Sequence, residues 1–192
     1  MNIKDIYELN VGDIFENVDL SKYTTYKLKS VGRVLVVPRD IEGLKKLISY
    51  IKEYNLKYKI LGNGSNLVFI NDFYDGILIK LDNFCSLDIE DTIVSVGAGY
   101  NLMKLALKCS MRGLSGFEFA TGIPGSVGGS VYMNAGAYNS DIASVLESAL
   151  ILTPDLEIVK YQNSDFDFGY RRSILQFNSG YICLAAQFKL SH

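Results

Sequence analysis

The segment from residue 113 to residue 138, GLSGFEFATGIPGSVGGSVYMNAGAY, limits what this chain can fold into more than any other part of it. It contains seven glycines in 26 residues and almost no charge. A flexible linker would not also carry the large apolar side chains of this segment: Phe117, Phe119, Ile123, Val127, Val131 and Met133. We therefore expect a folded segment whose backbone another group approaches closely.

The composition is typical of a folded protein with one large domain or two small ones. Of the 192 residues, 48% are hydrophobic and 21% are charged, and the formal net charge is −2. The chain has no large basic cluster, so nucleic acid is not an expected partner. No apolar run approaches the roughly 18 residues of a membrane span, so we expect no membrane segment and a cytoplasmic location.

The cysteines and the histidine limit the metal and cofactor chemistry. Cys85, Cys109 and Cys183 are widely spaced in apolar surroundings, and we expect them to be reduced, buried thiols. No metal site is expected, because the chain has no close cysteine pair and its single histidine, His192, is the last residue. The position of His192 also argues against histidine acid–base catalysis and against a histidine-linked cofactor.

Strand and helix patterns alternate along the chain. Residues 33–38 are typical of a buried strand, and residues 40–54 of a helix capped by Asp40. A strand at 57–62 would complete a right-handed parallel crossover. The later elements expected are strands at 76–81 and 92–99, a helix from Asn101 that stops at Gly113, two strands within 148–162, and a strand at 181–190.

This order of elements predicts two lobes. We expect an N-terminal extension at residues 1–21, a first lobe at 22–81 and a second lobe at 82–192. No internal repeat or low-complexity tract interrupts them. A cleft between two lobes would be a natural place for a ligand.

A first candidate binding loop directly follows the strand expected at 57–62. It consists of Gly62, Asn63, Gly64, Ser65 and Asn66. Glycines permit left-handed backbone angles, so such a loop can turn its amides toward a phosphate, and the serine and asparagine side chains can add donors. The alternative is a tight turn between strands. The loop matches neither a Walker A motif nor G-x-G-x-x-G.

A second candidate lies within the glycine-rich segment. Gly122, Gly125, Gly128 and Gly129 alternate with apolar residues, which would give an apolar wall with amide donors in it. Such a wall suits a flat, largely apolar group with a polar edge, or a pyrophosphate at a helix N-terminus. The alternative is close packing of a helix on a sheet, which also needs glycine. Two glycine-rich loops in one chain favour a dinucleotide.

A third candidate is the sequence FGYRRS, with two adjacent arginines, Arg171 and Arg172, beside Tyr170. Arginine is a fixed cation with several donors and suits a carboxylate, a phosphate or a developing oxyanion. The alternative for each arginine is a surface salt bridge. Glu118 stands in an apolar stretch and could be buried and paired, but it has no evident catalytic partner.

Several of these motifs occur together in a known family. TTYKLKSVGRVLVVP, ILGNGSNLVFIND, VSVGAGYNLMKLA, the glycine-rich segment and FGYRRSIL follow one another as in the UDP-N-acetylenolpyruvoylglucosamine reductases, which the chain resembles from Lys22 to Leu190. The resemblance implies an α+β fold, a two-lobed FAD-binding domain of the vanillyl-alcohol-oxidase (PCMH) type. It also implies non-covalent FAD, NADPH as reductant, and a UDP-sugar substrate in the synthesis of peptidoglycan for the cell wall.

The resemblance further implies roles for the candidate residues. Gly62, Asn63, Gly64, Ser65 and Asn66 would hold the FAD pyrophosphate. The flavin and its diphosphate would be lined by Gly122, Ile123, Pro124, Gly125, Ser126, Gly128, Gly129, Asn134, Ala135, Gly136 and Ala137. Arg171 would be the catalytic residue that polarises the substrate carboxylate and stabilises an enolate-like transition state, with Tyr170 beside it as a substrate-binding residue.

The chain departs from the family pattern in two places. Ser30 to Arg33 read SVGR where the family has glycines, a proline and an alanine. The family continues into a third, substrate-binding domain that supplies a proton-donating serine and a late glutamate, and we find no counterpart of it after AAQFKLSH. We therefore expect the FAD-binding part of such a reductase. The alternatives are a flavin-binding paralogue without reductase activity and another oxidoreductase of the same fold.

Overall fold

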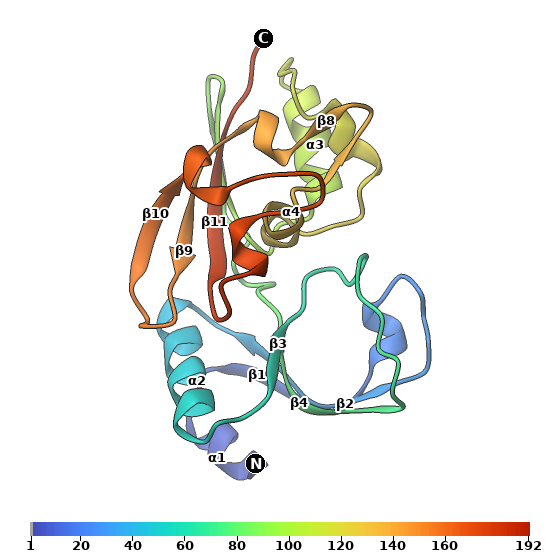
Figure 1. Cartoon of the computed structure of the whole chain (residues 1–192), viewed down its shortest axis with the longest axis vertical. Coiled ribbons are helices and arrows are strands. Elements are labelled where there is room, and N and C mark those ends of the chain that lie inside the picture. Colours follow the sequence, from blue (N-terminus) through green and yellow to red (C-terminus); the bar gives the residue numbers. More distant parts are fainter. Residues whose placement is uncertain (1) are drawn as a thin grey trace. The chain divides into compact units, whose positions relative to one another are not determined.

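The computed structural model describes residues 2–192, and the chain divides into two compact units. The first unit ends at Asn83 and the second begins at Phe84. Figure 1 shows their helices and strands, with the first unit in blue to green and the second in green to red. From the sequence we expected the division between residues 81 and 82, two residues earlier.

The first unit contains a four-stranded sheet. Its elements are α1 (Ile3–Glu8), β1 (Gly12–Asp19), the short 3-10 helix η1 (Leu20–Tyr23), β2 (Val31–Pro38), α2 (Ile41–Glu53), β3 (Tyr58–Ile60) and β4 (Phe73–Ile79). The strand order is β1-β2-β4-β3, so β4 lies between β2 and β3 and runs parallel to both. The segment expected as an N-terminal extension supplies β1, an edge strand antiparallel to β2.

Burial and capping explain the central elements of this unit. β2 is buried from Val34 onward, as expected for a strand covered on both faces. α2 begins after Asp40, whose Oδ1 accepts a hydrogen bond from the Gly43 amide at 2.8 Å. Its apolar stripe, which includes Leu44 and Leu47, is buried, and α2 lies beside the sheet in Figure 1. The predicted cap and the predicted strand–helix–strand order are thus confirmed.

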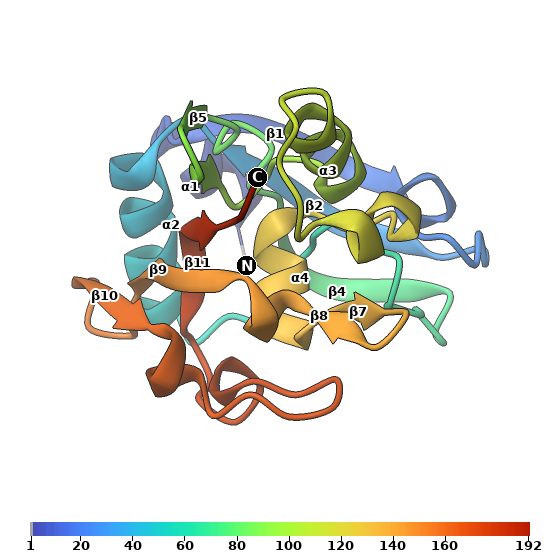
Figure 2. The ribbon, with the colours of Figure 1, turned by 90° about the horizontal axis from the view of Figure 1, so that it is seen from above.

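The second unit contains a five-stranded antiparallel sheet with the order β10-β9-β11-β6-β5. The strands of this sheet are β5 (Leu87–Glu90), β6 (Ile93–Gly97), β9 (Leu146–Leu152), β10 (Ile158–Gln162) and β11 (Ile182–Lys189), and β7 (Gly136–Ala137) and β8 (Ser140–Asp141) form a separate two-stranded sheet. The helices of this unit are α3 (Leu102–Ser110), α4 (Val127–Met133) and the 3-10 turns η2 (Glu118–Gly122), η3 (Ile142–Ser144), η4 (Asn163–Phe166) and η5 (Ile174–Gln176). α4 packs beside β11, and Figure 2 shows the short β7–β8 hairpin directly after α4.

The ends of α3 are those expected from the sequence. The side chain of Asn101 caps the first turn by accepting from the Lys104 amide at 2.9 Å. At the other end Gly113 has a φ of 75°, and the Leu114 amide donates back to the Cys109 carbonyl at 3.0 Å. This is the Schellman arrangement that a glycine permits, so Gly113 ends the last turn of the helix.

One expectation about a single residue is wrong, and one possibility considered for another residue is not realised. Cys109 and Cys183 are buried free thiols as expected, but Cys85 is exposed. Glu118 is exposed rather than buried. Hydrogen bonds from its own amide, the Ser115 hydroxyl and the Gly116 amide lower the pKa of its carboxyl group. Within residues 2–192 we find no helix of sufficient length and apolarity to cross a membrane, and no group of three or more side chains that could hold a metal.

The three thiols should differ in reactivity. Burial raises the pKa of Cys109 to about 11 and that of Cys183 to about 12, so both are almost entirely protonated at pH 8. We predict that native protein treated with iodoacetamide at pH 8 is alkylated at Cys85 alone, and at all three cysteines after unfolding. Peptide mass mapping would show this, and equal native labelling at Cys183 would contradict the buried position.

Candidate functional site

The start of α4 is held by the polypeptide itself. Ser126 is the N-cap, and its Oγ accepts a hydrogen bond from the Gly129 amide at 3.3 Å. The amides of Val127 and Gly128 donate to carbonyl oxygens in the segment between β6 and α3, at 2.9 and 2.8 Å. Since the three amides of this first turn have partners within the protein, they are unavailable to a pyrophosphate.

Three glycines near α4 are explained by close packing. A Cβ on Gly128 would lie 2.8 Å from the Ala98 Cβ, so this glycine lets α4 approach the end of β6. A Cβ on Gly125 would lie 2.9 Å from the Ser130 Oγ, and one on Gly136 would lie 2.5 Å from a carbonyl oxygen of β8. The alternative reading of helix-on-sheet packing therefore accounts for part of the glycine-rich segment.

Two other glycines leave the backbone open. Gly122 is exposed, and a Cβ built on it would have no neighbouring atom within 4 Å. Gly129 is also exposed, and its Cβ would meet only the Ser126 Oγ, at 3.1 Å. Between them Ile123 is half-buried and Pro124 is exposed. Nothing in the described protein requires glycine at 122, so this stretch is accessible to a ligand that needs close contact with backbone.

The loop of residues 62–66 belongs to the first unit, and its shape is set by packing. Gly64 has a φ of 66°, and a Cβ on it would lie 1.8 Å from the Tyr23 carbonyl oxygen. The Gly64 carbonyl in turn accepts from the Thr25 amide at 3.2 Å. Within the loop Gly62, Asn63 and Ser65 are half-buried and Asn66 is exposed. Gly64 is therefore required by the protein whether or not the loop binds an anion.

A buried lysine that we did not single out from the sequence supports this loop. Lys80 is only 8% exposed, and its Nζ donates to the Gly62 carbonyl at 3.2 Å and pairs with Asp82 at 3.2 Å. Its ammonium also lies 5.8 Å from the centre of the Tyr23 ring. It thus brings positive charge to the base of the loop. The sequence feature that could have identified Lys80 is its place within the apolar run GILIKL.

Asn134 joins the end of α4 to two other segments. It adopts a left-handed conformation with a φ of 43° and is 2% exposed. Its Nδ2 donates to the Asp141 Oδ2 at 3.0 Å and to the Gly169 carbonyl at 2.9 Å, and its Oδ1 accepts from the Ala143 amide at 2.9 Å. Because an amide has two N–H donors, both are used within the protein.

The two arginines of the FGYRRS sequence occupy different environments. Gly169 and Arg172 exchange backbone hydrogen bonds of 3.1 Å and close a tight turn around Tyr170 and Arg171. The Arg172 guanidinium forms an ion pair with Asp167. The Arg171 side chain is exposed over the ring of Tyr170, at 5.4 Å from its centre, and within residues 2–192 no carboxylate lies within ion-pair distance of it.

The backbone of Arg171 is left-handed, as it is at ten other non-glycine residues in the part of the chain that the structure describes. Its φ is 54°, a left-handed conformation that costs a non-glycine residue about 1–2 kcal/mol. Strained residues of this kind are held by their surroundings and concentrate at functional sites. Tyr170 before it is 92% exposed. Arg171 is therefore the arginine of the pair that is free to bind an anion.

These parts of the second unit form one arrangement around α4. The open backbone at Gly122 and Gly129 lies at the N-terminal end of α4, and the Arg171 turn is attached through Asn134 to its C-terminal end. Seven helical residues span about 10 Å. The arrangement can place a flat ligand along open backbone and hold an anion near the other end of the helix. Residues 62–66 lie in the other unit.

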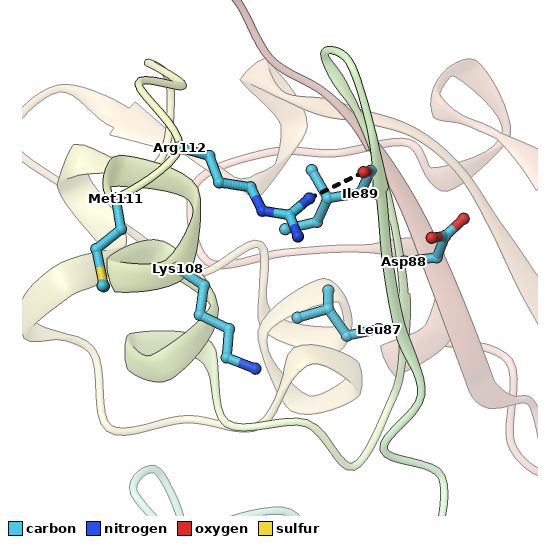
Figure 3. Close-up of a pocket in the computed structure, with 6 residues that line it drawn as sticks. All are labelled: Leu87, Asp88, Ile89, Lys108, Met111 and Arg112. Carbon is cyan, nitrogen blue, oxygen red and sulfur yellow. Dashed lines mark hydrogen bonds between the residues drawn. The ribbon is translucent and has the colours of Figure 1, made fainter.

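A hollow elsewhere in the second unit contains none of the predicted site residues. It has a volume of about 460 Å³ and lies between β5 and the end of α3. Figure 3 shows Lys108, Met111 and Arg112 on the helix side and Leu87 and Ile89 on the strand, with Asp88 turned away. Arg112 bridges the two elements by donating to the Ile89 carbonyl at 3.0 Å.

The fold and the open glycine backbone define a flavin-binding class of protein. Residues 32–162 match the family described as FAD binding domain, and the chain belongs to this family. Its fold is the α+β FAD-binding domain of the vanillyl-alcohol-oxidase type, and its cofactor is FAD. A chitooligosaccharide oxidase shares the fold with a TM-score of 0.74 at 15% identity, over 98% of this chain and 42% of that one.

More similar relatives have one name in common. The UDP-N-acetylenolpyruvoylglucosamine reductase of Bacillus licheniformis is 45% identical over 189 residues, which are 98% of this chain and 62% of that protein. The reductase of the same name from Bacillus subtilis is 42% identical with the same coverage. The crystal structure of the Thermus caldophilus reductase matches with a TM-score of 0.78 and 31% identity, over 94% of this chain and 62% of that one. The chain thus spans about 62% of the length of these relatives.

The residues present fit a flavin nucleotide at the glycine-rich segment. A ligand in contact with the backbone at Gly122 would meet no protein atom where a Cβ would stand. Ile123 and Pro124 add apolar surface beside this backbone, as an isoalloxazine ring needs. Because the amides at the start of α4 already donate hydrogen bonds within the protein, a flavin nucleotide would contact this open backbone and not the helix N-terminus.

Substitutions at Gly122 and Gly128 distinguish the effect of lost ligand contact from the effect of disturbed packing. We predict that Gly122→Val leaves the melting temperature unchanged and weakens FAD binding at least about tenfold, which corresponds to about 1.4 kcal/mol. Gly128→Val should instead lower stability by about 1–3 kcal/mol, because its side chain would overlap Ala98. Thermal unfolding and titration with FAD would measure both effects. Wild-type FAD affinity in Gly122→Val would show that this backbone does not contact the flavin.

Proposed function

We propose that this chain is the FAD-binding part of an NADPH-dependent reductase that converts UDP-N-acetylglucosamine enolpyruvate to UDP-N-acetylmuramate, a cytoplasmic step of peptidoglycan synthesis. The observation that carries the proposal is the unpaired, exposed Arg171, held in a left-handed turn at the end of the glycine-bordered helix α4. The similarity to reductases of this name over 98% of the chain supports it.

The glycine-rich segment would bind and orient the cofactor. Its open backbone between Gly122 and Gly129 would line the flavin, with Ile123 and Pro124 in apolar contact. Gly62 to Asn66 would hold the pyrophosphate, with the charge of Lys80 close by. When bound, FAD supplies hydride transfer between NADPH and the enolpyruvyl group.

Arg171 would act on the substrate. Its guanidinium would hold the enolpyruvyl carboxylate and stabilise the negative charge that develops there as the double bond accepts hydride. Tyr170, stacked with the guanidinium, would keep that side chain over the substrate. The Arg172–Asp167 pair would fix the turn beside it.

The reaction also needs a proton donor for the carbon that becomes negative. The carboxylate beside the arginine turn, Asp167, pairs with Arg172, and the single histidine, His192, contacts Asp91, so we assign the donor to neither. We propose that the donor and the walls that exclude water come from a third domain, which corresponds to the part of the relatives that this chain does not span. The UDP-sugar would be the ligand of this part of the reductase, and we propose neither nucleic acid nor a membrane as a partner.

Substitution of Arg171 tests this proposal. Arg171→Lys keeps the charge but loses the two-pronged geometry, so we predict that reoxidation of reduced flavin by the enolpyruvyl sugar nucleotide slows about 100-fold or more. FAD affinity and flavin reduction by NADPH should stay within about twofold. Stopped-flow absorbance of the flavin measures both half-reactions.

Arg112→Lys is the matched control, because Arg112 is another exposed arginine of the second unit and lies on the α3 hollow. It should leave both half-reactions unchanged. In protein that also contains the third domain, wild-type reoxidation that does not respond to the enolpyruvyl sugar nucleotide would contradict the proposed reaction and leave a flavin-binding module. Loss of FAD from Arg171→Lys with unchanged chemistry would contradict the role of Arg171.

A further inference from the structure

We infer that Asn134 and Gln176 are positioning residues for Arg171: their side-chain amides hold the Gly169 and Arg171 carbonyl groups of the Gly169–Arg172 turn and fix that turn to the C-terminal end of α4. This inference rests on the proposed function of Arg171. It assigns the Asn134 side chain a contact with the arginine turn, in addition to the place in the flavin lining that the family resemblance implies for this residue.

Gln176 holds the turn from one side. Its Nε2 donates to the Arg171 carbonyl at 3.0 Å and to the Tyr132 carbonyl at 2.9 Å, and it approaches the Met133 sulfur at 3.6 Å. The Tyr132 carbonyl belongs to the last turn of α4, where carbonyl groups lack helical partners. One amide group therefore joins the helix end and the left-handed residue.

Ser173 strengthens the same connection. It is fully buried, and its hydroxyl donates to the Tyr132 carbonyl at 2.7 Å. It comes directly after Arg172, so the chain that leaves the turn is fixed to the same helical carbonyl that Gln176 contacts. The turn is thus tied to α4 on the exit side by two side chains.

Asn134 holds the turn from the entry side. It is 2% exposed, and it donates to the Gly169 carbonyl while its other contacts reach Asp141 and Ala143. Gly169 and Arg171 are therefore each held by an amide from outside the turn. The direction of the Arg171 side chain follows from its backbone angles. Within the described residues its guanidinium lies over the ring of Tyr170 and forms no ion pair.

The isosteric change Gln176→Glu tests the inference on the chain itself. It replaces two N–H donors by oxygen opposite two carbonyl oxygens. We predict that the 13Cα and 13Cβ shifts of Arg171 move away from left-handed values and that amide exchange at Arg172 accelerates at least tenfold. Asn134→Asp should do the same, with faster exchange at the Gly169 amide.

Asn163→Asp is the matched control. The Asn163 Nδ2 also donates to two backbone carbonyls of the second unit, of Ala143 and Leu146, both at 2.8 Å, but it makes no contact with the turn. It should leave the Arg171 shifts and the Arg172 exchange rate unchanged. Unchanged Arg171 shifts and Arg172 exchange in Gln176→Glu would overturn the inference, and so would equal effects in Asn163→Asp.

The flavin half-reactions separate this inference from the proposed function. Gln176→Glu should slow reoxidation by substrate about tenfold and leave NADPH-dependent reduction and FAD affinity unchanged. If Gln176 acts through Arg171, the double variant Arg171→Lys/Gln176→Glu is no slower than Arg171→Lys alone. Additive losses, or normal reoxidation in Gln176→Glu when Arg171→Lys is slow, would overturn the positioning role. Normal reoxidation in Arg171→Lys would overturn the proposed function instead, while the Arg171 shifts still report on the turn.

Discussion

The contact between Gly128 of α4 and Ala98 at the end of β6 is the constraint on which the candidate site depends. No side chain larger than hydrogen fits there, and the amides at the start of α4 are bonded to carbonyl oxygens of the same segment. The position of α4 on its sheet is therefore fixed at the N-terminal end. That position leaves the backbone around Gly122 open at one end of the helix and carries Asn134 and the arginine turn at the other.

Glycine occurs in this chain for two different structural reasons, which the sequence alone does not distinguish. Gly64 and Gly128 are glycines because protein atoms occupy the space of a Cβ, whereas Gly122 faces open space and a Cβ on the exposed Gly129 would meet only the Ser126 Oγ. A neighbouring protein segment and a bound ligand both require glycine at the point of contact, so the spacing of glycines in the sequence does not distinguish them. The sequence indicated that another group approaches the backbone closely within residues 113–138. In the structure, protein atoms make this approach at Gly128, and the backbone at Gly122 is left accessible. The amides at the start of α4, one of the two places considered for an anion, donate to carbonyl groups between β6 and α3 and to the Ser126 hydroxyl.

Elements with strong local signals were predictable, and features that depend on the fold were not. Helix caps were found where expected, at Asp40 and Asn101, and the buried strands were found with shifted ends, as for β4, which spans Phe73–Ile79 and not 76–81. The strands β1 and β5 were missed because they are edge strands with largely exposed, mixed side chains. Adjacent arginines are equivalent in sequence, and only the fold pairs Arg172 with Asp167. Gln176 carries no local signal, since its two carbonyl partners come from distant or strained backbone. FAD, NADPH and the substrate were suggested by family resemblance, and the residues alone indicated only a dinucleotide.

We propose that flavin meets the open backbone at the start of α4, and amide chemical shifts on addition of FAD test this contact. In a labelled chain titrated with FAD, the largest changes in the second unit should fall on Gly122, Ile123 and Gly129, and should saturate at one FAD per chain. Residues 87–89 and 108–112, which line the hollow between β5 and α3, should hardly change. Saturable binding with its largest second-unit changes at that hollow, and none at Gly122 or Gly129, would contradict the claim.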